Sequence, residues 1–272
     1  MNSFKQGVTV MLRNSFKIYP RMKTPVLFNV KCNFFGSCKL MTDSKESHID
    51  AQQWRYLDEM CIVIDEKDKN IGKASKRECH KFDNIEKGLL HRAFSVILFN
   101  SSGELLLQQR SEKKITYPGY WTNSCCSHPL ATKEEMEEND EIGVKRAARR
   151  KLNHELGIAE SQIDLNKFEY LTKIHYKADN GPENSKEWGE HEIDYCLVYK
   201  GDVTIRINRN EVKNIEWITR KRLAEIIEDS NKNKMLVTPW FKLMAKIFIN
   251  EWWDNLEDLS KCYDKDTIHK FA

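Results

Sequence analysis

Runs of apolar residues separated by short polar turns divide the middle of the chain into strands. Two pairs of such runs predict β-hairpins, and the second pair is apolar enough to lie centrally in a sheet. Three longer alternating segments predict further strands. The hairpins span residues 61–65 with 71–75 and 93–99 with 105–109, and the other strands span residues 168–177, 190–200 and 211–218.

Helical spacing dominates the later part of the chain. A segment rich in Glu, Lys, Arg and Ala predicts a helix over residues 141–156, which Gly157 ends. A second helix is predicted over residues 220–229. Thr238-Pro239 opens an aromatic helix that continues through Trp253, with Pro at a favourable early position. Strands followed by helices indicate one α+β domain over residues 50–272.

Charge is distributed unevenly along the 272 residues. The formal net charge is +3, but residues 1–42 hold seven Lys or Arg and no acid, which leaves 37 basic against 41 acidic residues in the rest. An acidic body without a basic face argues against nucleic acid as a partner. No 18-residue apolar run is present, which argues against a membrane span. We expect a monomer that binds a small molecule.

The basic, acid-free segment of residues 1–42 is amphipathic, which is typical of a mitochondrial transit peptide. The alternatives are a disordered extension or a translation start at Met22 or Met41. The C-terminal Lys-Phe-Ala is not a peroxisomal signal. We therefore expect a mitochondrial protein if the segment is a transit peptide, and a cytoplasmic one otherwise. Eight cysteines without CxxC spacing indicate free thiols rather than disulfides.

Two carboxylates lie close together in the strand at residues 190–200. Side chains of a strand alternate between its faces, so Glu190 and Glu192 share one face and His191 takes the other. The two carboxylates repel each other unless water solvates them, one is protonated, or a cation lies between them. A solvated acidic face and a metal site are both compatible with this segment.

Three histidines lie beside predicted strands or loops, at His80, His91 and His128. A lone histidine is most often a satisfied surface or core residue. With Glu190 and Glu192, however, the three would form an N3O2 set with one open position for a divalent metal. Imidazole-rich sites suit Zn²⁺ or Mn²⁺ and Mg²⁺ prefers oxygen, so the identity of the metal stays open.

Basic residues gather before and after the second predicted hairpin. Arg110 and Lys114 follow its second strand, and Lys76 precedes His80. Exposed basic residues usually serve solvation. Together with the hydroxyl of Ser127, these three could instead hold a diphosphate by charge-assisted hydrogen bonds.

The order of strand, glycine-containing loop and helix around residues 150–158 resembles part of a Nudix box. In that box, carboxylates on a helix hold a metal on a diphosphate. Lys151 and His154 stand where the box has Glu. This departure argues against diphosphate hydrolysis.

Six motifs, in order, make the chain from about Met60 to Trp253 resemble the animal and fungal type I isopentenyl-diphosphate isomerases. That family has a Nudix-like mixed sheet between helices and interconverts isopentenyl and dimethylallyl diphosphate. The motifs are His91-Arg-Ala-Phe-Ser-Val, Leu-Leu-Leu-Gln-Gln-Arg110, Thr-Asn-Ser-Cys-Cys-Ser-His-Pro129, Ile-His-Tyr-Lys177, Trp-Gly-Glu-His-Glu-Ile-Asp-Tyr195 and Thr-Pro-Trp-Phe-Lys242.

The resemblance implies a role for each of the candidate residues. Cys126 and Glu192 would be the acid/base pair, and Tyr176 and Trp240 would close over the isoprenoid. Glu155 would hold a second, substrate-bridging Mg²⁺. The metal ligands would be His80, His91, His128, Glu190 and Glu192, and the diphosphate would contact Lys76, Arg110, Lys114 and Ser127.

Moving a double bond by protonation at one carbon and deprotonation at another passes through a tertiary carbocation. Such a site needs two groups that each give and take a proton. We expect Glu192, helped by Tyr176, to deliver the proton to C4 while Cys126 removes one from C2. Trp240 would stabilise the cation by cation–π attraction, or it would serve core packing alone. Adjacent thiols on an extended segment face opposite ways, so only one can reach the substrate, and the resemblance selects Cys126 rather than Cys125.

Two other functions compete with an isomerase. A Nudix hydrolase would release orthophosphate or pyrophosphate from a diphosphate substrate. A zinc-binding interaction module would use its histidines and cysteines for folding alone, and would therefore unfold without metal.

Overall fold

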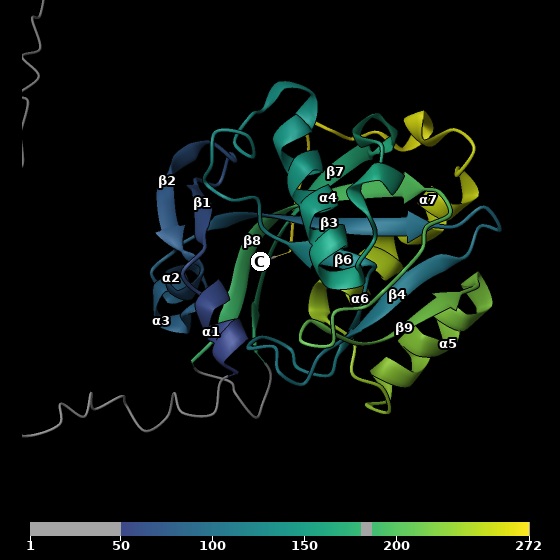
Figure 1. Ribbon diagram of the computed structural model, residues 1–272, viewed down its shortest axis with the longest axis horizontal. Helices are drawn as coiled ribbons and strands as arrows, with labels where there is room; N and C mark the ends of the chain where they lie inside the picture. Colours follow the sequence, from purple (N-terminus) through teal and green to yellow (C-terminus); the bar gives the residue numbers. More distant parts are fainter. Residues whose placement is uncertain (1–49, 181–186, 272) are drawn as a thin grey trace, which may run out of the picture. The chain divides into compact units, whose positions relative to one another are not determined.

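A mixed β-sheet runs through the computed structural model, which describes residues 50–180 and 187–271 (Figure 1). Its main path follows the order β10-β7-β8-β3-β1-β2, and β4, β5, β6 and β9 are attached to β3 or to one another. The strands are β1 (Met60–Ile64), β2 (Asn70–Ser75), β3 (His91–Phe99), β4 (Leu105–Arg110), β5 (Trp121–Thr122), β6 (Cys125–Ser127), β7 (Glu169–Asp179), β8 (Gly189–Lys200), β9 (Val212–Ile218) and β10 (Ile268–Lys270).

Helices cover both faces of this sheet. α4 lies on one face, and α5, α6 and α7 lie on the other (Figure 1). The short helices α1 to α3 lie near the β1–β2 hairpin. The helices are α1 (Ala51–Tyr56), α2 (Lys76–His80), α3 (Phe82–Glu86), α4 (Ile142–Leu156), α5 (Arg220–Asn231), α6 (Pro239–Ile247) and α7 (Ile249–Asp254), and the 3-10 turns are η2 (Asn139–Glu141), η3 (Glu160–Gln162), η4 (Leu165–Lys167) and η5 (Leu259–Cys262).

The central strand β3 is buried along its whole length. Phe94 and Val96 belong to the core beneath α4, whereas Ile97 and Phe99 belong to the core beneath α5 to α7. A strand covered on both faces has no solvent-facing side, which is why the second half of β3, Val96 to Phe99, is a continuous apolar run. β3 pairs in parallel with β8, and this pairing brings distant parts of the chain to one edge.

The predicted second hairpin is present, with β3 and β4 antiparallel on either side of the turn, but its pairing is confined to the turn end. β3 and β4 pair only at Phe99 and Leu105, next to the turn. Beyond that point, β6 occupies the edge of β3 and pairs Ser95 with Cys126. β4 turns away to pair with β9 from Leu105 to Arg110. The separation of β4 from β3 occurs near the candidate active site described below.

The predicted aromatic C-terminal helix is wrong as a single element. It breaks at Phe248, whose φ of −117° departs from helical geometry, so that α6 and α7 are separate helices. Phe248 stacks on Trp252 with ring centroids 5.4 Å apart. The break lets aromatic residues on both sides of it reach the same core.

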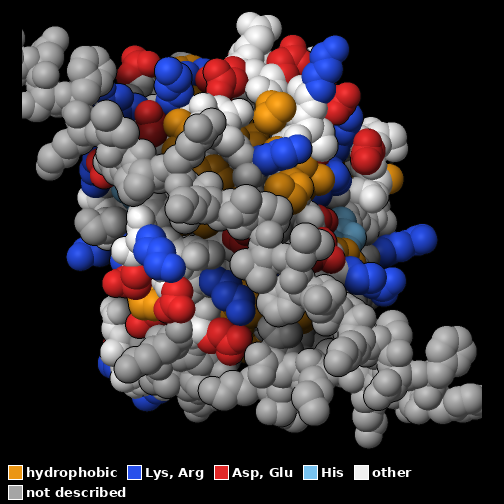
Figure 2. Space-filling view, turned by 90° about the vertical axis from the view of Figure 1, so that its left-hand side faces the viewer, with side chains coloured by type: hydrophobic (Ala, Val, Ile, Leu, Met, Phe, Trp, Pro, Cys, Tyr) orange, Lys and Arg blue, Asp and Glu red, His pale blue; other side chains and the backbone are white. Residues whose placement is uncertain are grey.

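The remaining predicted elements are present with ends shifted by at most two residues. The short elements α1 to α3, β5, β6 and β10 were not predicted. No helix among the described residues is long and apolar enough to cross a membrane. Acidic and basic side chains are interspersed on the side of the molecule that Figure 2 shows. The predicted transit peptide at residues 1–42 lies outside the described residues.

Candidate active site

Strands β3 and β8 place a candidate histidine ligand beside a candidate carboxylate ligand of the metal. Their parallel register sets His91 next to Glu192. Alternation along β8 turns Glu190 and Glu192 inward, as the sequence predicted, and both are buried. His191 lies on the other face, where its Nδ1 contacts the carbonyl of Leu89 at 2.9 Å.

Helix α2 delivers the second histidine. Ser75 and Glu78 form a capping box that starts this helix directly after β2. The Nδ1 of His80 lies 2.8 Å from the carbonyl oxygen of Lys76, which fixes the ring. Its Nε2 therefore faces the Oε2 of Glu190 at 2.9 Å.

The third histidine follows β6, and the Nε2 of His128 lies 2.7 Å from the Oε1 of Glu192. One ligand atom from each of the five residues lies within 4.8 Å of every other, and all five residues are buried. The structure thus brings together the five residues predicted as a metal centre, which are His80, His91, His128, Glu190 and Glu192.

The cluster fits a cation because some of its atoms lack a hydrogen bond. Glu190 Oε2 and His91 Nε2 are buried without one, although Glu190 Oε2 lies 2.9 Å from His80 Nε2 and His91 Nε2 lies 3.1 Å from Glu192 Oε1. Buried polar atoms are normally partnered. Burial acts to raise the pKa of Glu192, but contact with His91 and the charge of His80 outweigh it and hold that pKa at about 2. Burial and the neighbouring imidazoles hold the pKa of His128 well below its ordinary value.

The sixth predicted ligand, Glu155, lies outside this cluster. It is buried on α4, and its Oε1 lies 3.1 Å from the ammonium of Lys151. Its Oε2 accepts a hydrogen bond from the side-chain amide of Gln108 at 3.0 Å. Lys151 and Lys114 lower the pKa of Glu155 against the effect of burial. Lys151, which stands where a Nudix box has Glu, thus acts as a counter-ion.

The two adjacent thiols on β6 face opposite sides, as predicted. Cys125 is fully buried and lies 3.5 Å from Glu155 Oε2. Cys126 lines a pocket that His80, His128, Glu190 and Glu192 also line. Its Sγ is 3.9 Å from a terminal nitrogen of Arg110. Burial raises the pKa of the Cys126 thiol to about 12, with Arg110 acting in the opposite direction.

The two predicted aromatic residues, Tyr176 and Trp240, line the pocket. The hydroxyl of Tyr176 donates to Glu192 Oε2 at 2.5 Å, and burial followed by the Glu192 charge raises its pKa well above the ordinary value. Trp240 is only 2% exposed to solvent, and its indole N–H donates a hydrogen bond to Asn123 Oδ1 at 3.1 Å. The guanidinium carbon of Arg110 lies 5.7 Å from the centroid of the Trp240 ring.

All four predicted diphosphate contacts line the same pocket: Lys76, Arg110, Lys114 and Ser127. The guanidinium of Arg110 is buried and donates to the carbonyl of Thr116 at 2.7 Å, and no carboxylate pairs with it among the described residues. The pKa of Lys76 is lowered by burial and by nearby Lys114 and Lys151. Several cationic side chains lining one pocket favour the binding of an anionic ligand.

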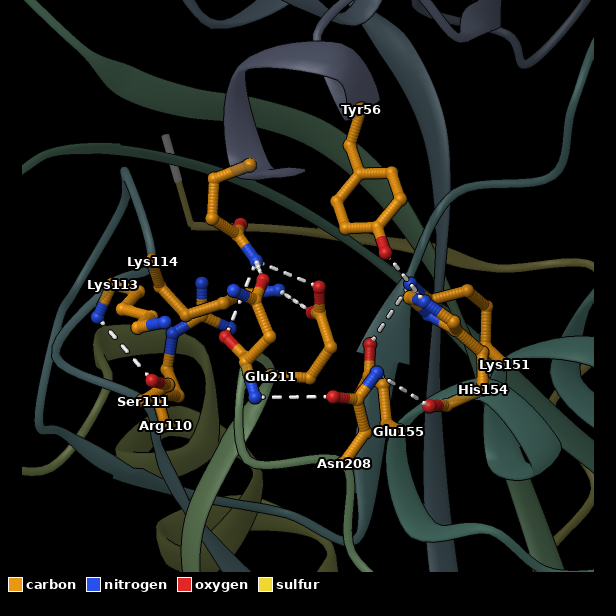
Figure 3. Close-up of polar contacts among 12 residues, drawn as sticks. Tyr56, Arg110, Ser111, Lys113, Lys114, Lys151, His154, Glu155, Asn208 and Glu211 are labelled. Carbon is orange, nitrogen blue, oxygen red and sulfur yellow. Dashed lines mark hydrogen bonds and ion pairs between the residues drawn. The ribbon is translucent and has the colours of Figure 1, made fainter. Parts of the chain in front are cut away.

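Sequence reasoning missed part of the pocket. Gln53 and Tyr56 come from α1, and Asp194 continues the Glu190 and Glu192 face of β8. The alternation that predicted Glu190 and Glu192 as partners extends to Asp194 and could have found it. No local pattern pointed to α1 or to Glu211, which binds Lys114 (Figure 3).

Comparison with known proteins defines the class first. A family model described as NUDIX domain matches residues 89–241, in agreement with a mixed sheet between helices. Isopentenyl-diphosphate Delta-isomerase 1 of Mesocricetus auratus is 50% identical over 230 residues, which cover 85% of this chain and 100% of that protein. An isopentenyl-diphosphate delta-isomerase of Gibberella zeae is 50% identical over 225 residues, covering 81% and 86%. An isopentenyl-diphosphate Delta-isomerase of Dictyostelium discoideum is 47% identical over 222 residues, covering 80% and 92%.

The chain belongs to the isopentenyl-diphosphate Delta-isomerase family, and it is an enzyme. The predicted fold class and the predicted family are confirmed.

Proposed function

We propose that the protein interconverts isopentenyl diphosphate and dimethylallyl diphosphate in isoprenoid biosynthesis, using Cys126 and Glu192 as its acid/base pair. One observation carries this proposal. A single pocket is lined by the thiol of Cys126, by Glu192 with its bound Tyr176, and by three cations. Family membership supports the same reaction.

The reaction needs a proton added at C4 and another removed from C2. Addition at C4 breaks the terminal double bond and leaves a tertiary carbocation at C3. Loss of the C2 proton then forms the new double bond. We assign the first transfer to Glu192 and the Tyr176 hydroxyl, and the second to Cys126, with the roles reversed in the back reaction.

The protonation states of the two proposed proton-transfer groups match the start of the back reaction. A pKa of about 12 keeps Cys126 a neutral thiol, and a pKa of about 2 keeps Glu192 ionised. A thiol can give its proton to C2, and a carboxylate can take one from C4. By microscopic reversibility, the forward reaction starts from the opposite distribution, with the thiol ionised and a proton on the Glu192 and Tyr176 pair.

The pocket also explains how a carbocation would be tolerated. Trp240 and Tyr176 lie with ring centroids 5.9 Å apart, and both are buried. Aromatic faces attract cations by roughly 2 kcal/mol or more where water is excluded. The exclusion of water also prevents the cation from being captured as an alcohol.

We assign the divalent metal to His80, His91, His128, Glu190 and Glu192, with Mg²⁺, Mn²⁺ and Zn²⁺ as the candidates. A metal bound there would supply positive charge that holds Glu192 in its carboxylate form. We assign a substrate-bridging Mg²⁺ to Glu155, a buried carboxylate whose charge Lys151 balances in the structure. Lys76, Arg110, Lys114 and Ser127 would bind the diphosphate itself.

The test is to incubate metal-loaded protein with isopentenyl diphosphate in deuterated water. Dimethylallyl diphosphate carrying deuterium is the expected product. Release of orthophosphate or pyrophosphate instead would favour a Nudix hydrolase. Chelation separates an enzyme from a structural zinc module, because we expect the metal-free chain to stay folded while its activity is lost.

A further inference from the structure

Glu211 is a buried acid beside the pocket that the proposed reaction does not use. It directly precedes β9, and its side chain is 0% exposed. Its Oε2 accepts from the ammonium of Lys114 at 2.5 Å, and its Oε1 accepts from the side-chain amide of Gln53 at 2.7 Å (Figure 3). The Glu211 carboxylate thus links Lys114, which is predicted to bind the diphosphate, to Gln53 on helix α1.

The backbone of Glu211 binds the same turn that its side chain contacts, which runs from Ser111 to Lys114. Its carbonyl accepts from the amide of Ser111 at 2.9 Å, and the carbonyl of Ser111 accepts from the amide of Lys114 at 3.1 Å. The segment that carries Lys114 is therefore attached to Glu211 at both ends of its turn. The ammonium of Lys114 has little freedom to swing away.

Charge in this region makes such an anchor necessary. Lys114 and Lys151 both lie close enough to Lys76 to help burial lower the pKa of Lys76. Three cations in a partly buried space repel one another, and a flexible lysine would otherwise extend into water. Glu211 supplies the opposite charge at hydrogen-bonding distance, and the side chain of Lys114 is only 10% exposed.

The contacts of Glu211 and its neighbour Asn210 also fix helix α1. Gln53 also donates to Asn210 Oδ1 at 2.7 Å, and Asn210 donates to the N-cap carboxylate of Asp50 at 2.9 Å. Lys113 pairs with Asp50 at 3.1 Å. Because Gln53 and Tyr56 line the pocket, the position of α1 shapes the space above Lys114.

We propose that Glu211 is a positioning residue, which holds the ammonium of Lys114 at the diphosphate end of the pocket and holds α1 against it. Glu211 itself does not line the pocket and does not touch the substrate. The inference rests on the proposed function, because it takes Lys114 as a ligand of the diphosphate.

The variant Glu211→Gln tests this role, since it removes the charge and preserves the shape. We expect KM for isopentenyl diphosphate and Kd for inorganic pyrophosphate, measured calorimetrically with Mg²⁺ present, to rise about tenfold, with kcat within about threefold of wild type. Glu216→Gln is the matched control. Glu216 lies on β9 and pairs with Arg222 at 3.0 Å, away from the pocket, so its loss should leave both constants unchanged.

A double-mutant cycle separates positioning from general stabilisation. If Glu211 acts through Lys114, Glu211→Gln should weaken pyrophosphate binding in wild type but have no further effect in the Lys114→Met background. Equal losses in both backgrounds, or an unchanged Kd in the single variant, would overturn the inference. If Glu211→Gln does not fold, Glu211→Asp takes its place in the cycle with the same criteria. Wild-type protein that neither binds pyrophosphate nor isomerises its substrate would instead overturn the proposed function.

Discussion

Tyr176 and Glu192 lie opposite each other on the antiparallel strands β7 and β8, and the Tyr176 hydroxyl donates to Glu192 Oε2 at 2.5 Å. The other oxygen of Glu192 faces His91 and His128. One carboxylate therefore contacts the imidazole cluster on one side and a phenolic proton on the other. This arrangement is suited to a group that must keep a fixed position while it exchanges a proton.

Replacing Tyr176 by Phe removes that phenolic proton and leaves the ring. We expect kcat for isopentenyl diphosphate to fall about 100-fold with KM nearly unchanged, because a positioned proton donor contributes at least that much. The control is Tyr170→Phe on the same strand, where the hydroxyl binds the carbonyl of Lys265. A kcat within threefold of wild type in Tyr176→Phe would contradict the proton-transfer role.

Replacing Cys126 by Ala should abolish turnover and leave the fold and metal content intact, because the thiol is one of the two proton-transfer groups. The neighbouring variant Cys125→Ala is its matched control. Cys125 is fully buried and faces α4, so we expect only a loss of about 1 kcal/mol in the free energy of unfolding. Activity and denaturant unfolding measured on both variants decide the assignment, and near-normal activity in Cys126→Ala would refute it.

Removing one imidazole from the cluster should remove the metal. We expect His128→Ala, loaded with Mn²⁺ and dialysed, to retain much less than one ion per chain in this site by elemental analysis. His191→Ala should retain the wild-type content, because His191 lies on the other face of β8. Equal metal content in the two variants would place the ion elsewhere.

The raised pKa of Cys126 predicts how its alkylation depends on pH. Thiolate is the reactive form, so the rate rises about tenfold per pH unit below the pKa. With that pKa at about 12, alkylation of metal-free protein by iodoacetamide should still be rising between about pH 9 and pH 10, where a free thiol of ordinary pKa levels off. Peptide mass spectrometry would follow Cys126 separately, with free N-acetylcysteine as reference. A plateau below about pH 9 would show that burial does not dominate.

We propose that residues 1–42 direct the protein to mitochondria, on the basis of their seven basic residues and no acidic ones. Fused to a fluorescent protein, this segment should give mitochondrial fluorescence. Replacing Arg13, Lys17 and Arg21 by Glu should make the signal diffuse. Diffuse fluorescence from the unaltered fusion would indicate a cytoplasmic protein.

Local periodicity determined much of this site in advance. Alternation along β8 predicted that Glu190 and Glu192 share a face opposite His191, and alternation along β6 separated Cys125 from Cys126. These relationships depend only on the twofold repeat of a strand, so neighbouring residues are enough to establish them. Glycine and proline likewise marked the end of α4 and the start of α6.

Only the tertiary structure decided which distant groups meet. The parallel register of β3 and β8 sets His91 beside Glu192, and the departure of β4 toward β9 brings Lys114 to Glu211 across 97 positions of sequence. Strand order and register arise from packing of the whole sheet, which no local pattern encodes. The charge balance is divided in the same way, because Lys151 pairs with Glu155 one turn along α4, whereas Glu211 meets Lys114 only through the fold.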